Sequence, residues 1–90
     1  MFFENEDIKE LYALVLSLEN ADDCANLFED LCTAKEIEQM AQRVKAAKLL
    51  LEGKTYNQIM EVADISSATL SRVSRCVQYG SGYSKLLKKE

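Results

Sequence analysis

Hydroxyl and guanidinium side chains gather in one short stretch of this 90-residue chain. Its polar members are Ser67, Thr69, Ser71, Arg72, Ser74, Arg75 and Gln78. No aspartate or glutamate occurs from Ile65 through Ser84, so nothing in that range would repel a phosphate group. Short hydroxyls let a helix backbone approach base edges, and arginine can bind guanine or phosphate through two hydrogen bonds. The chemistry that this stretch favours is recognition of a nucleic-acid duplex.

The sequence predicts two helix starts, one before this polar stretch and one at its beginning. Thr55 and Gln58 have the spacing of a capping box, which predicts a first helix there. Its apolar positions are Ile59, Met60, Val62 and Ala63. Ser66 or Ser67 can cap a second helix, because apolar residues recur after them at three- and four-residue steps. Those residues are Ala68, Leu70, Val73, Cys76 and Val77. Residues 55–78 are therefore predicted to form a helix-turn-helix.

Three earlier helices are expected to support this motif. Apolar periodicity predicts helices over residues 8–19 and 22–31, the second with Asn20 or Asp22 available as a cap. A capping box at Thr33 and Glu36 opens the longest pattern, a central helix that ends at Gly53 as a left-handed cap. Its predicted apolar stripe is Ile37, Met40, Ala41, Val44, Ala47, Leu50 and Leu51.

The absence of proline, together with only three glycines, favours an all-α fold of about six helices joined by short connections. Gly80 and Gly82 are expected to end the second motif helix in turn conformations that other residues avoid. The basic segment Tyr83–Glu90 is expected to be either a last helix or a frayed tail. Residues 1–90 are interpreted as a single domain.

The distribution of charge matters more here than its sum. The net charge of −4 is unfavourable for binding a polyanion, but residues 1–45 hold eleven acids and four bases. Residues 46–90 hold four acids and seven bases, so the half that contains the motif is basic. Because the local field governs binding, moderate and strongly salt-dependent affinity is expected.

Composition argues against several other classes of protein. The chain has no apolar run of membrane-spanning length, and its start, MFFENED, is acidic where a signal peptide is basic, so a cytoplasmic location is expected. Three cysteines without CxxC spacing, and no histidine, argue against a structural metal site or disulfides and favour reduced, mostly buried thiols. The sequence has no histidine, no nucleophile–base spacing, no glycine-rich phosphate loop and no metal cluster, so enzyme function is not expected.

Three segments of the chain resemble motifs of a known family. The segments CTAKE at Cys32–Glu36, QRVKAAKLLLEGKTYNQI at Gln42–Ile59 and ATLSRVSRC at Ala68–Cys76 resemble the Trp repressor. The chain as a whole resembles the small YerC/YecD-type Trp-repressor-like proteins of bacteria. The resemblance implies a DNA-binding regulator, most simply a repressor, that folds as an intertwined homodimer and associates with the nucleoid when bound to DNA. Each helix-turn-helix would read a major groove of double-stranded DNA.

The resemblance also implies a pocket for a small corepressor between core and reading helix. Thr33, Arg43 and Arg72 match pocket residues of the family. Two positions depart from it, because Val73 replaces a glycine that makes room for an indole ring and Cys76 replaces a pocket serine. Tryptophan is therefore not the expected effector, and a regulator without any effector stays equally open. Arg43 could instead pair with nearby acids, and Arg72 could hold a phosphate.

The two groups of contacts expected at DNA have different roles. Ser67, Thr69 and Ser71 are expected to face base edges, so Thr69→Ala should relax sequence preference. The backbone contacts are assigned to Lys54, Tyr56, Asn57, Arg72 and Arg75. The alternative function is a protein-interaction module, in which the acidic half docks a basic partner and the two-helix motif only packs.

Overall fold

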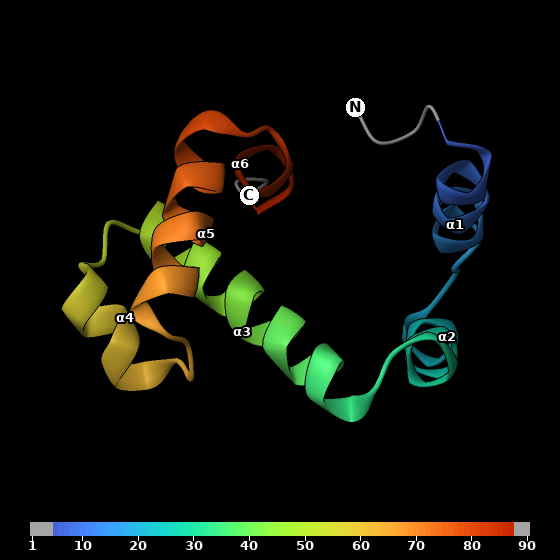
Figure 1. Cartoon of the computed structure of the whole chain (residues 1–90), viewed down its shortest axis with the longest axis horizontal. Helices are drawn as coiled ribbons and strands as arrows, with labels where there is room; N and C mark the ends of the chain where they lie inside the picture. Colours follow the sequence, from blue (N-terminus) through green and yellow to red (C-terminus); the bar gives the residue numbers. More distant parts are fainter. Residues whose placement is uncertain (1–4, 88–90) are drawn as a thin grey trace. The chain divides into compact units, whose positions relative to one another are not determined.

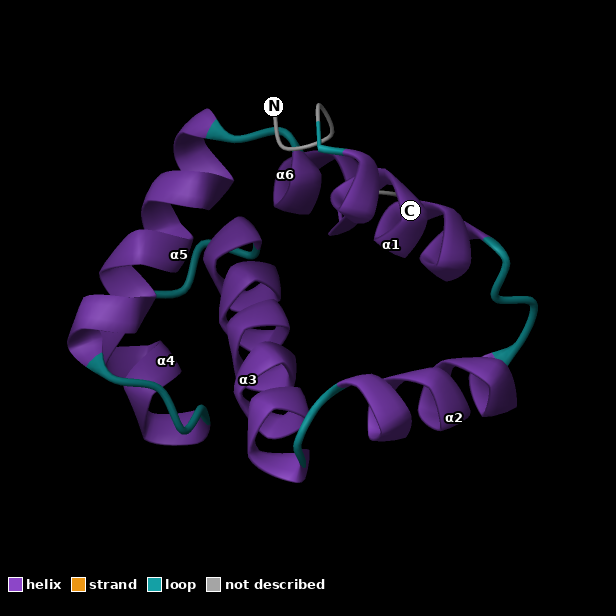
Figure 2. Cartoon of the chain, turned by 45° about the vertical axis from the view of Figure 1, so that its right-hand side comes forward, coloured by secondary structure: helices purple, strands orange, loops and turns teal. Residues whose placement is uncertain are grey.

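The structure is a computed structural model that describes residues 5–87. Its helices are α1 (Glu6–Leu16), α2 (Ala21–Leu31), α3 (Ala34–Leu51), α4 (Tyr56–Val62), α5 (Ser67–Tyr79) and α6 (Gly82–Leu87). No strand occurs within the described range, so the prediction of an all-α fold with about six helices is confirmed (Figures 1 and 2). The described helices include none that is both long and apolar enough to cross a membrane.

The chain divides into two compact units, one that ends at Thr33 and one that begins at Ala34. The interpretation of residues 1–90 as a single domain therefore stays a prediction. Part of the acidic N-terminal stretch, residues 1–4, and the last three residues of the basic C-terminal segment lie outside the described residues.

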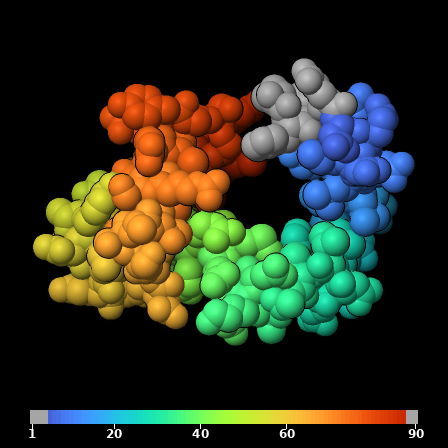
Figure 3. Space-filling view, in the orientation of Figure 1, coloured from blue at the N-terminus to red at the C-terminus, as the bar shows by residue number. Residues whose placement is uncertain are grey.

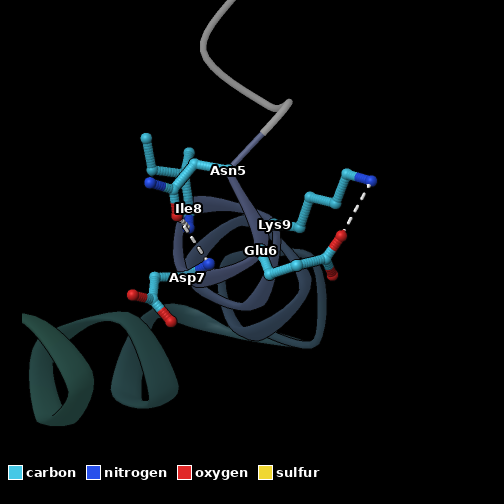
Figure 4. Close-up of polar contacts among 5 residues, drawn as sticks. All are labelled: Asn5, Glu6, Asp7, Ile8 and Lys9. Atoms are coloured by element: carbon cyan, nitrogen blue, oxygen red, sulfur yellow. Dashed lines mark hydrogen bonds and ion pairs between the residues drawn. The ribbon is translucent and has the colours of Figure 1, made fainter.

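The first unit contains α1 and α2, and an asparagine caps each helix. The Asn5 side chain accepts hydrogen bonds from the backbone N–H groups of Asp7 at 2.7 Å and Ile8 at 3.2 Å (Figure 4). Because of this cap, α1 begins at Glu6, two residues before the predicted start. The helix ends at Leu16, three residues before the predicted end. Asn20 caps α2 through the N–H of Asp23 at 2.8 Å, as expected.

The second unit is built around α3, which packs against α4, α5 and α6. Figures 1 and 2 show α5 crossing α3, with α4 beside both. The buried core consists of Ala46, Ala47, Ile59, Ala63, Leu70 and Val73. Two adjacent small alanines on α3 allow the backbones of neighbouring helices to come close, and the larger Ile59 and Leu70 side chains fill the space around them.

Several predicted apolar stripes are wrong in detail. On α3, Ala41 and Val44 are exposed, whereas Ala46, absent from the predicted stripe, is completely buried. On α4, Met60 and Val62 are exposed at 42% and 56%. Helical spacing finds a wide apolar sector, but the direction from which neighbours approach decides which part of that sector is covered.

The predicted starts of α4 and α5 and the predicted cap at Gly53 are confirmed. Thr55 and Gln58 form the complete capping box, with the Gln58 Oε1 accepting from the Thr55 N–H at 2.8 Å and the Thr55 hydroxyl accepting from the Gln58 N–H at 3.2 Å. Ser66 rather than Ser67 caps α5, through the N–H of Thr69 at 3.2 Å. Gly53 has a φ of +89°, the left-handed conformation expected after the central helix.

The prediction that the second motif helix ends at Gly80 is confirmed, because Gly80 is the C-cap of α5, but the turn conformations expected of Gly80 and Gly82 are wrong. Gly53 is the glycine with positive φ among the described residues, whereas Gly80 is extended and Gly82 begins α6. Gly80 is needed for a different reason, because a Cβ atom there would lie 2.7 Å from the carbonyl oxygen of Cys76. A glycine at this position lets the chain leave α5 close to the last helical turn.

Removing the α4 cap gives a modest, local prediction. Thr55→Ala eliminates the hydroxyl that accepts from the Gln58 N–H, and it should lower the free energy of unfolding by about 1 kcal/mol. Urea denaturation followed by circular dichroism would measure the loss. Thr55→Ser keeps the hydroxyl and is the matched control, so an equal loss in both variants would contradict the capping explanation.

Candidate nucleic-acid interface

The outer surface of α5 carries a continuous stripe of exposed side chains. Ala68, Ser71, Arg72 and Arg75 are spaced at i, i+3, i+4 and i+7, which places them on one side of the helix. All four are exposed, whereas Leu70, on the other side of α5, is fully buried. Burial of Leu70 keeps the stripe facing solvent, because a rotation of α5 about its axis would expose the Leu70 side chain to water.

Charge on this stripe is uncompensated within the second unit. Neither Arg72 nor Arg75 forms an ion pair with another described residue, and the α5 sequence contains no carboxylate. Exposed guanidinium groups are strong donors of paired hydrogen bonds to phosphate and guanine. The stripe therefore combines two free cationic groups with a small hydroxyl and a methyl group, a surface that a DNA groove can approach closely.

Ala68 is a functional candidate that sequence reasoning missed. It was assigned with Cys76 to the buried stripe of the second motif helix, but both residues are exposed. The signal was present, because Ala68 has the i, i+3, i+4 and i+7 relation to Ser71, Arg72 and Arg75. An exposed alanine methyl can contact the methyl group of thymine.

The other predicted base-contacting hydroxyls differ in their surroundings. Ser67 is exposed at the first position of α5. Thr69 is only half-exposed, and its Oγ1 lies 3.0 Å from the donating hydroxyl of Ser66 within the helix cap. A base contact by Thr69 stays a prediction. Its place in the cap means that Thr69→Ala would also alter the start of α5.

Helix α4 brings the remaining predicted DNA contacts to the surface. Lys54, Tyr56 and Asn57 are all exposed around the start of α4. Figure 3 shows the atoms of α4 and α5 side by side on one face of the second unit. The Lys54 N–H donates to the carbonyl of Leu49 at 3.0 Å, which fixes the backbone between α3 and α4.

Two side chains of α3 hold the turn between α4 and α5. Lys45 Nζ donates to the carbonyl oxygen of Val62 at 2.7 Å, and Gln42 Oε1 accepts from the N–H of Asp64 at 2.9 Å. Sequence reasoning missed both residues. No local signal could have found them, because each partner is a backbone atom 17 or 22 positions further along the chain.

The predicted effector residues of the second unit lie in different surroundings. Arg43 is half-buried and lines a pocket of about 280 Å³ between α3 and the turn before α5. The other lining residues are Gln39, Gln42, Asp64, Ile65, Ser66 and Thr69. Val73 is 2% exposed and belongs to the core, and Arg72 points outward on the α5 stripe.

Cys76 lines a different and nearly apolar hollow of about 510 Å³ formed by α3, α5 and α6. Its other lining residues are Val44, Gly80, Gly82, Tyr83, Leu86 and Leu87. Thr33 is exposed and belongs to the first unit. The four residues of the second unit are thus not gathered in one pocket, and the effector site stays a prediction.

The three cysteines carry free thiols. The expectation that they would be mostly buried is wrong, because Cys24 and Cys76 are exposed and Cys32 is half-buried. The core of the second unit is small and filled by other side chains, so it leaves Cys76 at its edge. The described residues contain no group of three or more acids or cysteines that could hold a metal ion.

Comparison with known proteins agrees with this geometry. A family model described as "Trp repressor protein" matches residues 6–90. The uncharacterized protein YerC of Bacillus subtilis (strain 168) is 43% identical over 75 residues, which cover 83% of this chain and 72% of that protein.

Two solved structures share the fold. One, from Staphylococcus aureus and described as a candidate Trp repressor, has a TM-score of 0.89 and 38% identity, and the match covers 97% of this chain and 91% of that one. A TrpR-like protein from Eubacterium eligens has a TM-score of 0.90 and 38% identity, with 94% and 89% covered. With its helix-turn-helix geometry, its family match and these relatives, the chain belongs to the Trp repressor family.

Proposed function

We propose that this protein regulates transcription by binding specific sequences of double-stranded DNA. The observation that carries the proposal is the exposed, acid-free stripe of Ala68, Ser71, Arg72 and Arg75 on α5. Membership of a DNA-binding regulatory family supports it. In this proposal α5 enters the major groove, where its short side chains allow close approach and its guanidinium groups bind guanine or phosphate.

The two helices of the motif make different contacts with the DNA. Sequence preference is determined by hydroxyl side chains that face base edges, those of Ser67, Thr69 and Ser71. Arg72 and Arg75 contact the sugar-phosphate backbone and so orient the helix-turn-helix on the DNA. Lys54, Tyr56 and Asn57 add backbone contacts from the start of α4. Regulation by exclusion of polymerase, that is repression, is the simplest consequence of a small protein occupying an operator.

A homodimer is the second part of the proposal. The single chain leaves large apolar side chains of α1 exposed, with Leu14 at 48% and Leu16 at 85%. In the second unit, Leu86 of α6 is 65% exposed beside the apolar hollow. Apolar surface of this kind favours association with a second copy, which would place two reading helices on successive major grooves.

Sedimentation velocity tests the dimer. We expect a mass near twice that of the 10.2 kDa chain over a range of micromolar concentrations. Replacing Leu86 by lysine should shift the equilibrium towards monomer, because it would place a charge on the associating surface. A wild-type protein that remains monomeric at every concentration would contradict the intertwined arrangement.

Tryptophan is not expected to be the effector of this protein. Val73 occupies core volume that an indole ring would need, and Arg43 and Cys76 line separate pockets. Isothermal titration of the protein with L-tryptophan should therefore give no saturable heat at micromolar concentration. Clear saturation would overturn this expectation, and Val73→Gly, which restores space for a ring, offers a variant for comparison.

Selection of duplex DNA from a random pool at moderate salt tests the function itself. Enrichment of a palindrome with half-sites about one helical turn apart would support a dimeric reader and provide the operator. If no sequence is enriched, the selection is repeated with a mixture of amino acids present. Continued failure would favour the alternative, a protein-interaction module in which the two helices only pack.

A further inference from the structure

The turn between α4 and α5 is held by side chains from outside the helix-turn-helix. Gln42 and Lys45 are one turn apart on α3; Lys45 makes a hydrogen bond to the backbone at the end of α4, and Gln42 makes one to the backbone of the turn. Their partners, the Val62 carbonyl and the Asp64 N–H, flank the buried Ala63. The turn is therefore connected to α3 on both sides of its buried residue.

Both backbone groups would otherwise lack a partner from regular structure. Val62 is the last residue of α4, and the carbonyl groups in the last turn of a helix receive no hydrogen bond from an N–H group of the same helix. Asp64 lies between the helices, beyond the hydrogen-bonding pattern of either one. Side chains that satisfy such groups determine where one helix ends and how the chain enters the next. Two residues later, Ser66 caps α5.

Gln42 also lines the pocket between α3 and the turn. Its lining includes Gln42 and Arg43 from α3, Asp64 from the turn and Thr69 from α5. A ligand bound in such a pocket could fix the helix-turn-helix in place by connecting α3 to the turn. In this chain the Gln42 side chain already makes that connection, at 2.9 Å.

We infer that Gln42 and Lys45 are positioning residues that set the angle of α5, so that the reading helix is ready for DNA without a small-molecule ligand. This inference rests on the proposed function, since it assigns a regulatory property to the same helix-turn-helix. If the angle of α5 were free, only a fraction of molecules would be competent, and apparent affinity would fall by that fraction.

The test uses the full-length protein and the duplex obtained by selection, with no amino acid added. Gln42→Ala removes the acceptor, and Lys45→Met removes the ammonium group while keeping most of the apolar stem. Gln39→Ala and Lys48→Met are matched controls, because these exposed residues have the same types and lie one turn away on α3. Lys45→Arg retains a cationic donor and is the rescue variant. Circular dichroism identifies a temperature at which all variants are folded.

Three results are expected. The double variant Gln42→Ala/Lys45→Met should bind the duplex about tenfold more weakly, while the double control should bind like wild type. The slope of log affinity against log salt should stay unchanged, because neither residue is assigned to a phosphate contact. Amide hydrogen exchange at Asp64 should be faster in Gln42→Ala than in Gln39→Ala.

The outcomes that overturn the inference are distinct from failure of the proposed function. Unchanged affinity of the double variant would overturn it, as would a flatter salt slope, which would identify Lys45 as a phosphate contact. Equal Asp64 exchange in Gln42→Ala and Gln39→Ala would show that Gln42 does not hold the turn, whatever the protein binds. If wild-type protein selects DNA only with an amino acid present, the ligand-free setting of α5 is refuted while DNA binding stands.

Discussion

Replacing Leu70 by alanine is expected to lower the free energy of unfolding by about 2 to 5 kcal/mol. Leu70 is completely buried in the core of the second unit, between the outward stripe of α5 and the helices beneath it. The loss combines reduced apolar burial with a cavity that close-packed neighbours fill only in part. Because small domains are stabilised by only about 5 to 15 kcal/mol, this change should strongly reduce the folded population on heating.

Urea denaturation monitored by circular dichroism would measure the effect of Leu70→Ala. Val62→Ala is the control, since it also truncates an apolar side chain of the motif, but one that is 56% exposed. The control should cost well under 1 kcal/mol, because its side chain stays largely in water. Similar losses in the two variants would contradict the assignment of Leu70 to the core.

Replacing both Arg72 and Arg75 by alanine is expected to weaken binding to every DNA sequence by about 100-fold or more, with little change in stability. Both residues are exposed on α5 and form no ion pair with another described residue. If each neutralises one phosphate, the slope of log affinity against log salt should fall by about 2 in magnitude. Fluorescence anisotropy with labelled duplexes at several salt concentrations would measure both quantities.

The control for this experiment is the double variant Lys9→Ala/Lys35→Ala. It removes the same amount of positive charge from exposed positions outside α5. A loss that depends only on net charge would appear in both variants, whereas contacts made by the α5 stripe would be lost only in the arginine variant. Equal salt slopes for wild type and the arginine variant would mean that these residues do not contact phosphates.

Much of the local structure of this chain could be predicted from side-chain chemistry. The Thr55 and Gln58 capping box and the positive φ of Gly53 were both predicted and are both present. These features depend on neighbours within a few residues, so their partners are visible in the sequence. The absence of acids on α5 is likewise a property of composition and needs no fold to establish it.

The placement of side chains on the correct side of each helix was less predictable. Cys76 and Ala68 were assigned to the buried side of α5 but are exposed, and Val44 of α3 is 42% exposed. A helical period defines a broad sector, and several registers fit the same apolar residues. Which register is used depends on where α3 and α6 contact α5, and that information is not local.

By itself, the sequence determined the order of the helices, the caps that open α2, α4 and α5, and the chemistry available on α5, because each of these depends on residue types at short spacing. The tertiary structure decided which part of each helix is covered and which distant side chains hold the turn. Gln42 and Lys45 show the physical reason most clearly, since their partners are backbone groups that every residue possesses. Only the fold of the second unit brings those particular groups within hydrogen-bonding distance.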